Sequence, residues 1–99
     1  MNSNIEKITE LILALNTKEE IMAFLNELLT ESEITTLSKR WRILSMLAEG
    51  RTQRDIVKEL HVSLCKVTRG SKILKGKNSV IAKYFMEDLK NGNTNNFKR

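Results

Sequence analysis

The stretch TQRDIVKELHVSLCKVTRGS, residues 52–71, decides how this chain folds. Thr52 is a good helix N-cap, and Asp55 stands three residues later, where a capping box places its acidic side chain. Apolar residues follow Gln53 at offsets of 3, 4, 7, 9 and 14 positions, namely Ile56, Val57, Leu60, Val62 and Val67. This spacing predicts a short helix with one apolar side and a second apolar segment that can pack against it.

A turn divides the stretch into two helices. His61 and Val62 form the turn, and Ser63 caps a second helix in which Val67 faces inward. Over residues 52–74 the arrangement predicts a helix-turn-helix, whose second helix leaves its N-terminal part free to enter a DNA major groove. An ordinary helical hairpin fits the same spacing, so the pattern alone leaves both interpretations open.

Charge is distributed unevenly along the chain. Residues 1–38 carry a net charge of −5, residues 39–75 carry +7 from ten basic and three acidic side chains, and residues 76–99 carry +3. The basic excess coincides with the predicted helix-turn-helix, where a polyanion such as double-stranded DNA would bind with release of counterions. We expect the lysines of this region to attract the DNA backbone: Lys58, Lys72 and Lys75. A basic face that only meets solvent is the alternative, and its overlap with a DNA-reading motif argues against it.

The N-terminal part of the chain predicts further amphipathic helices. Apolar residues recur at helical spacing over residues 4–16 and indicate a first helix. A capping box of Thr17 with Glu20 starts a second helix, and one of Thr30 with Glu33 starts a third.

Small residues mark the remaining boundaries. Gly50 ends the third helix, and Ser79 caps the last one. The fold class is therefore all-α, with about six helices. We predict a single domain over residues 1–90, followed by a disordered, asparagine-rich tail over residues 91–99.

The first two helices carry apolar stripes that need a partner. A chain of 99 residues can build only a small core, and association of two chains buries more apolar surface. We expect a homodimer in which the first three helices of the two chains interlock. A self-contained monomeric bundle is the competing interpretation.

Enzyme chemistry is nearly absent from the sequence. His61 is the one histidine, Cys65 is the one cysteine, and there is no glycine-rich phosphate loop. We therefore expect no catalytic residues, no bound metal and no required cofactor. The chain has neither a membrane-spanning apolar run nor a signal-peptide layout, so we expect a cytoplasmic protein with no membrane partner. Cys65, at the start of the second helix of the motif, could touch a thymine methyl group.

Three segments resemble the Trp repressor family: LTESEITTLSKRWRIL at 29–44, LAEGRTQRDIVKEL at 47–60 and VTRGSKILK at 67–75. The resemblance covers about residues 25–89. It implies an intertwined homodimer with one helix-turn-helix per subunit, which reads a palindromic operator. It also implies L-tryptophan as a possible co-repressor, bound between the core and the DNA-reading helices.

The resemblance also implies roles for individual residues. Arg40 and Arg69 match the arginines that sandwich the indole and hold the carboxylate, and Thr30, Gly70 and Leu29 match other pocket positions. Six further residues match or lie at positions that face DNA in the family: Gln53, Arg54, Leu64, Cys65, Lys66 and Thr68.

Five positions depart from the family pattern. Ile73 replaces a serine that supports the amino group of the ligand, and Glu27 replaces an apolar wall residue. Val57 replaces a lysine that faces a DNA phosphate. Trp41, which we expect to lie in the core, replaces a small aliphatic residue next to Arg40. His61 replaces a turn glycine and would need a left-handed backbone there.

These observations lead to one function and three alternatives. We expect a sequence-specific DNA-binding transcriptional repressor controlled by a small carboxylate ligand such as L-tryptophan. A regulator of the same family that needs no ligand is the first alternative. A DNA-binding module like those of replication initiators is the second, and a helical dimer that binds other proteins and carries an accidental basic patch is the third.

Overall fold

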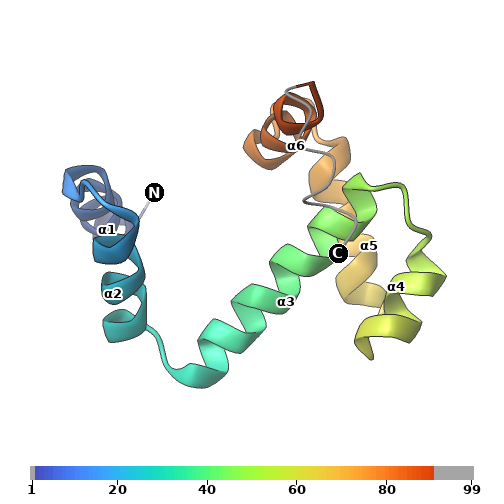
Figure 1. The fold of residues 1–99 in the computed structure, drawn as a ribbon, viewed down its shortest axis with the longest axis horizontal. Coiled ribbons are helices and arrows are strands. Elements are labelled where there is room, and N and C mark those ends of the chain that lie inside the picture. The colour runs from blue at the N-terminus through green and yellow to red at the C-terminus, as the bar shows by residue number, and fades with distance from the viewer. Residues whose placement is uncertain (1, 91–99) are drawn as a thin grey trace. The chain divides into compact units, whose positions relative to one another are not determined.

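The structure is a computed structural model in which residues 2–90 are described. Its regular elements in that range are all helices: α1 (Ser3–Ala14), α2 (Lys18–Leu28), α3 (Glu31–Ala48), α4 (Gln53–Leu60), α5 (Leu64–Lys75) and α6 (Val80–Lys90) (Figure 1). The predicted all-α class with about six helices is therefore confirmed for the described residues. The tail predicted over residues 91–99 lies outside them.

The predicted capping boxes start α2 and α3. The Glu20 N–H donates to Thr17 Oγ1 over 3.1 Å, and Glu20 Oε1 accepts from the N–H groups of Asn16 and Thr17. These backbone donors hold the pKa of the Glu20 carboxyl below its usual value. Thr30 and Glu33 exchange the same pair of bonds, over 2.9 and 3.1 Å. Both boxes are confirmed.

The chain divides into two compact units, and the boundary falls within α3. The N-terminal unit is Met1–Thr36, and the C-terminal unit is Leu37–Arg99. No described residue of the N-terminal unit is buried. Its exposed large apolar side chains are Ile5, Leu11, Leu13, Met22 and Leu28. The N-terminal unit therefore does not cover its own apolar stripes, and the homodimer stays a prediction.

Two apolar clusters hold the C-terminal unit together. Ile43 and Met46 of α3, Ile56 of α4 and Val67 of α5 form the first. Leu44 of α3 and Phe85 of α6 form the second. Full burial of one such side chain contributes roughly 1.5–3 kcal/mol. These clusters fix α4, α5 and α6 against the C-terminal half of α3.

Within residues 2–90, two backbone positions have positive φ angles, and both lie at helix ends. Gly50 has a φ of 92° just after α3, and His61 has a φ of 54° at the end of α4. The predicted left-handed conformation of His61 is confirmed. It turns the chain directly from α4 toward Ser63, the N-cap of α5.

Trp41 does not lie in the core of the single chain, so that prediction is wrong. Its side chain is 45% exposed. Its indole packs instead against two rings of α6, with centroid distances of 5.7 Å to Tyr84 and 5.1 Å to Phe85. Only part of this large side chain is covered, because α6 contacts one side of it.

Candidate nucleic-acid interface

The helix-turn-helix forms from α4 and α5. Thr52 Oγ1 accepts the N–H of Asp55 over 3.1 Å, and Ser63 Oγ accepts the N–H of Lys66 over 3.3 Å. Ile56 and Val67 are both 0% exposed and pack in the same cluster. The caps define where each helix begins, and the buried pair locks α4 onto α5.

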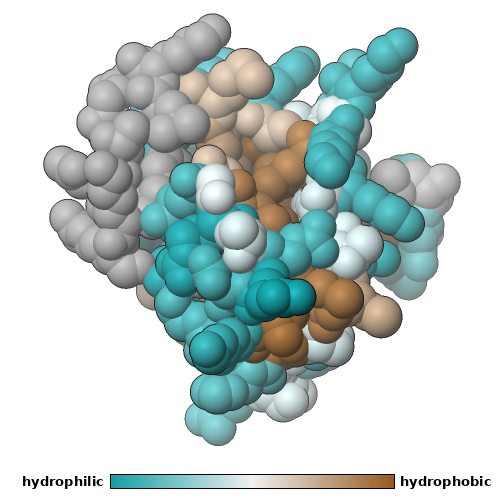
Figure 2. Space-filling model, turned by 90° about the vertical axis from the view of Figure 1, so that its right-hand side faces the viewer, coloured by the Kyte–Doolittle hydropathy of each residue, from teal (hydrophilic) through white to brown (hydrophobic). Residues whose placement is uncertain are grey.

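The side chains at the N-terminal end of α5 lie outside the apolar core and are exposed to solvent. Leu64 is 56% exposed, and Cys65 and Lys66 are exposed as well. Most residues predicted to face DNA share this exposure: Arg54, Lys58, Leu64, Cys65, Lys66, Lys72 and Lys75. Figure 2 faces the side of the molecule that bears α4 and α5, where hydrophilic side chains surround a smaller apolar area. An exposed helix start with basic neighbours is the arrangement that a major groove accepts.

Gln53 and Thr68, which were also predicted to face DNA, are only half-buried and contact each other. Thr68 Oγ1 donates to Gln53 Oε1 over 3.2 Å. The bond joins the first residue of α4 to the second turn of α5. Neither composition nor helical spacing indicated this pairing.

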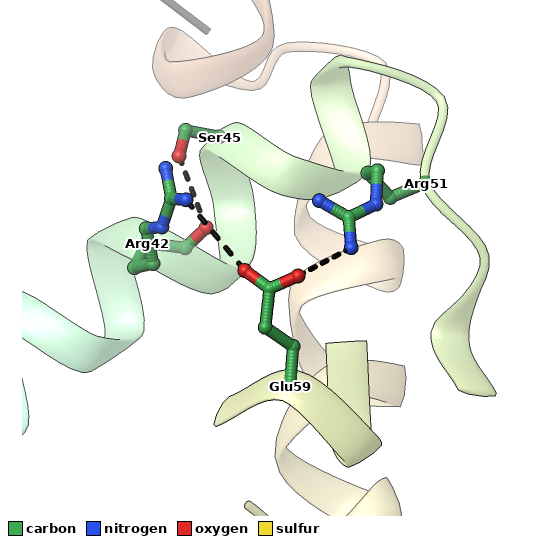
Figure 3. Close-up of polar contacts among 4 residues, drawn as sticks. All are labelled: Arg42, Ser45, Arg51 and Glu59. Carbon is green, nitrogen blue, oxygen red and sulfur yellow. Dashed lines mark hydrogen bonds and ion pairs between the residues drawn. The ribbon is translucent and has the colours of Figure 1, made fainter. Parts of the chain in front are cut away.

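The sequence patterns did not predict that the carboxylate of Glu59 lies between two arginines. Arg51 Nη2 lies 2.6 Å from Glu59 Oε1, and Arg42 Nη2 lies 3.8 Å from Glu59 Oε2 (Figure 3). The hydrogen bond from Arg51 lowers the pKa of Glu59 and raises that of Arg51. This cluster of Arg42, Arg51 and Glu59 ties α4 to α3 and to the segment between them. Two of the ten basic side chains of residues 39–75 are therefore paired with Glu59, which the net charge of +7 already includes.

The residues expected to bind a carboxylate ligand fall in both units. Arg40, Arg69 and Gly70 belong to the C-terminal unit, whereas Leu29 and Thr30 belong to the N-terminal unit. Arg40 and Arg69 are both exposed. The ligand site therefore stays a prediction.

Gly70 has a packing role that the resemblance did not indicate. A Cβ added there would lie 3.2 Å from both Ile43 Cγ2 and Leu47 Cδ1. Glycine thus lets α5 approach α3 closely. Ile73, one turn further along, packs against the cluster of Leu44 and Phe85.

Two other kinds of site were searched for in residues 2–90. No group of three or more His, Cys, Asp or Glu side chains converges there to hold a metal ion. None of the helices in this range combines the length and the hydropathy that a membrane crossing requires.

Comparisons with known proteins agree with the resemblance. A family model described as "Trp repressor protein" matches residues 3–89. A Trp operon repressor homolog of Chlamydia trachomatis serovar D is 31% identical over 94 residues, which span 90% of this chain and 100% of the relative. A Trp operon repressor homolog of Chlamydia caviae is 38% identical over 85 residues, which span 85% of this chain and 80% of the relative. No solved structure matches the chain.

Proposed function

The chain belongs to the Trp repressor family, and on this premise we propose that it is a sequence-specific DNA-binding regulator that represses transcription. The observation that carries the proposal is the exposed start of α5, which lies in the basic part of the chain. The buried residues Ile56 and Val67 pack α5 against α4 and leave this start exposed. The family consists of regulators rather than enzymes, so the proposal includes no catalytic activity.

The proposed contacts divide by chemistry. Arg54, Lys58, Lys66, Lys72 and Lys75 are exposed cations that attract phosphates and release counterions. Leu64 and Cys65 present apolar groups at the tip of α5, where thymine methyl groups lie in the major groove. Each phosphate that the protein neutralises adds about 0.9 to the magnitude of the slope of log affinity against log salt concentration.

The proposed DNA-binding species is a homodimer. Two copies would present two α5 helices about one DNA turn apart, which matches a palindromic operator. The uncovered apolar residues of α1 and α2 support this assembly, because a second chain would remove them from water. Light scattering at micromolar concentration tests it, and a mass near that of one 11.4 kDa chain would contradict it.

We further propose that a small carboxylate, with L-tryptophan as first candidate, controls the affinity for DNA. Arg40 and Arg69 would hold the carboxylate, and the other proposed pocket residues are Leu29, Thr30 and Gly70. A ligand controls binding only if it prefers the arrangement that fits DNA, and coupling of about 1–3 kcal/mol is usual. Isothermal titration with L-tryptophan tests the step; no heat at millimolar ligand favours a regulator that needs no ligand.

The DNA-binding proposal has a direct experiment. An operator is selected from a random duplex pool, with and without L-tryptophan, and the affinity of Arg54→Ala combined with Lys66→Ala is then measured. We expect this variant to lose binding while its thermal unfolding stays unchanged. Lys7→Ala combined with Lys18→Ala removes the same charge from the acidic N-terminal unit and is the matched control. A wild-type chain that binds no duplex at low salt would refute the proposal.

A further inference from the structure

The exposed side of α4 divides into a basic ridge and an acidic ridge. Arg54 and Lys58 lie four positions apart, and so do Asp55 and Glu59; all four residues are exposed. Because residues four positions apart share one face of a helix, each pair forms a ridge of its own. The basic ridge attracts a polyanion, whereas the acidic ridge beside it repels one. The balance between the two ridges therefore affects how strongly α4 binds any duplex.

Arg51 neutralises the acidic ridge at Glu59. Its Nη2 atom donates to Glu59 Oε1 over 2.6 Å, and Arg42 Nη2 lies 3.8 Å from the other carboxylate oxygen (Figure 3). Hydrogen bonds between ionised groups are the stronger ones, and this one is short. It lowers the pKa of Glu59 and raises that of Arg51, so both groups are charged near neutral pH. The carboxylate of Glu59 therefore fixes the position of the Arg51 guanidinium.

The position of Arg51 in the chain places a cation near the proposed path of the DNA. Arg51 directly precedes Thr52, the N-cap of α4, and the first helix of a helix-turn-helix crosses the DNA backbone. The side chain of Arg51 is 35% exposed, so it is not enclosed by the protein. Its hydrogen bond nevertheless directs it to Glu59, in the last turn of α4. A phosphate near the start of α4 would have to draw Arg51 away from this carboxylate.

Such an exchange is unfavourable while Glu59 carries its charge. Departure of Arg51 would break the shorter of the two contacts and leave Glu59 with Arg42, its more distant partner. The carboxylate would then lie beside the negatively charged duplex, and like charges repel each other. The gain from a new phosphate contact is therefore offset by the lost hydrogen bond and by this repulsion.

We propose that Glu59 keeps Arg51 away from the DNA backbone and thereby limits the sequence-independent part of the affinity for duplex DNA. The inference rests on the proposed function and deepens it, because it names a residue that sets this affinity without touching the DNA. Phosphate contacts carry no direct sequence information, so the limit applies equally to the operator and to any other duplex.

The variant Glu59→Gln tests the proposal on the selected operator and on a random duplex. Glutamine keeps the shape of glutamate and removes the charge that holds Arg51. We expect the variant to bind both duplexes more tightly than the wild type does, by the same factor. One added phosphate contact steepens the salt dependence, so a rise from about 50 to about 200 mM salt should weaken the variant about threefold more than the wild type. A lower affinity would indicate a merely structural role, and an unchanged salt dependence would exclude a new phosphate contact; either result overturns the proposal.

Two further variants separate the release of Arg51 from a change in net charge. Glu59→Gln combined with Arg51→Gln restores the net charge of the wild type, and we expect its affinity and salt dependence to return to the wild-type values. Asp55→Asn removes one negative charge from the same acidic ridge and keeps the bond between Arg51 and Glu59, so its salt dependence should stay that of the wild type. If either variant gains as much as Glu59→Gln, the lost negative charge alone explains the gain and the proposal is overturned.

The phosphate that Arg51 reaches after its release is located with operator duplexes that each carry one neutral methylphosphonate linkage. We expect one linkage to weaken binding by Glu59→Gln and to leave the wild type and the double variant unaffected. If that linkage weakens the wild type to the same extent, Arg51 already contacts the phosphate and the proposal is overturned. All variants are assayed well below their thermal midpoints, so that each is folded. A wild-type chain that binds no duplex refutes the proposed function, whereas one that binds DNA no more weakly than Glu59→Gln refutes this inference alone.

Discussion

Replacement of Gly70 by alanine tests the close approach of α5 to α3. The added Cβ would lie 3.2 Å from Ile43 Cγ2, 3.2 Å from Leu47 Cδ1 and 3.6 Å from Leu44 Cδ2. Carbon atoms in ordinary contact stand about 3.5–4.0 Å apart, so two of these neighbours would have to move. Both of these neighbours, Ile43 and Leu47, belong to α3, and Ile43 is buried.

Two effects of opposite sign set the magnitude. Alanine in the middle of a helix is favoured over glycine by about 1 kcal/mol. Extra volume in a packed core costs about 1–3 kcal/mol. We expect the packing cost to exceed the helix gain, with a net loss near 1 kcal/mol, which corresponds to a fall of about 4–8 °C in the midpoint of a domain this size. Gly70→Val adds two more methyl groups at the same crossing and should lose at least twice as much.

The assay is thermal and urea unfolding followed by circular dichroism, without L-tryptophan. The chain concentration is held constant, since the stability of a dimer depends on it. Lys72→Ala, at an exposed position of the same helix, is the control and should change stability by less than about 0.5 kcal/mol. A midpoint of Gly70→Ala above that of the wild type would refute the reasoning, because it would mean that Ile43 and Leu47 give way without cost.

Three further predictions use other features of the C-terminal unit. Ile56→Ala leaves a cavity at a fully buried position and should cost about 2–5 kcal/mol in urea unfolding; a loss below 1 kcal/mol would contradict the described core. His61→Gly removes the cost of a left-handed non-glycine residue and should stabilise by up to about 1 kcal/mol, whereas a lower urea midpoint would argue against the φ of 54°. The pKa of Glu59 is lowered on folding, so its contribution to stability is present above its usual pKa of 4.5 and is lost as the pH falls through the lower folded value. Glu59→Gln should therefore melt below the wild type near pH 7, and this difference should shrink as the pH falls below 4.5; a difference that stays the same down to about pH 3 would exclude the ion pairs as its cause.

Local signals predicted most of the helices. Capping residues such as Thr17, Thr30 and Ser63 stand within three positions of the groups that they satisfy, so their role can be read from short patterns. Helix ends were less certain: the first helix was expected over residues 4–16 and runs over Ser3–Ala14. Apolar spacing also placed Ile56 and Val67 inward, as the structure has them.

The candidate interface was predicted in outline. The exposed start of α5 follows from the inward position of Val67, because residues on the opposite side of the helix must face outward. The contact of Gln53 with Thr68 could not be predicted, since it depends on how closely α4 and α5 approach. The same is true of Glu59, whose two arginine partners lie 8 and 17 positions away.

The helical class, the helix starts and the position of the helix-turn-helix follow from the sequence, because caps, turns and apolar periodicity act over a few neighbouring residues. Which distant side chains meet follows from the packing of the helices. It made Gly70 a crossing point of α5 and α3, placed Trp41 on the rings of α6, and paired Gln53 with Thr68. Such contacts depend on the distance and angle between packed helices, which the buried side chains of all the packed helices set together.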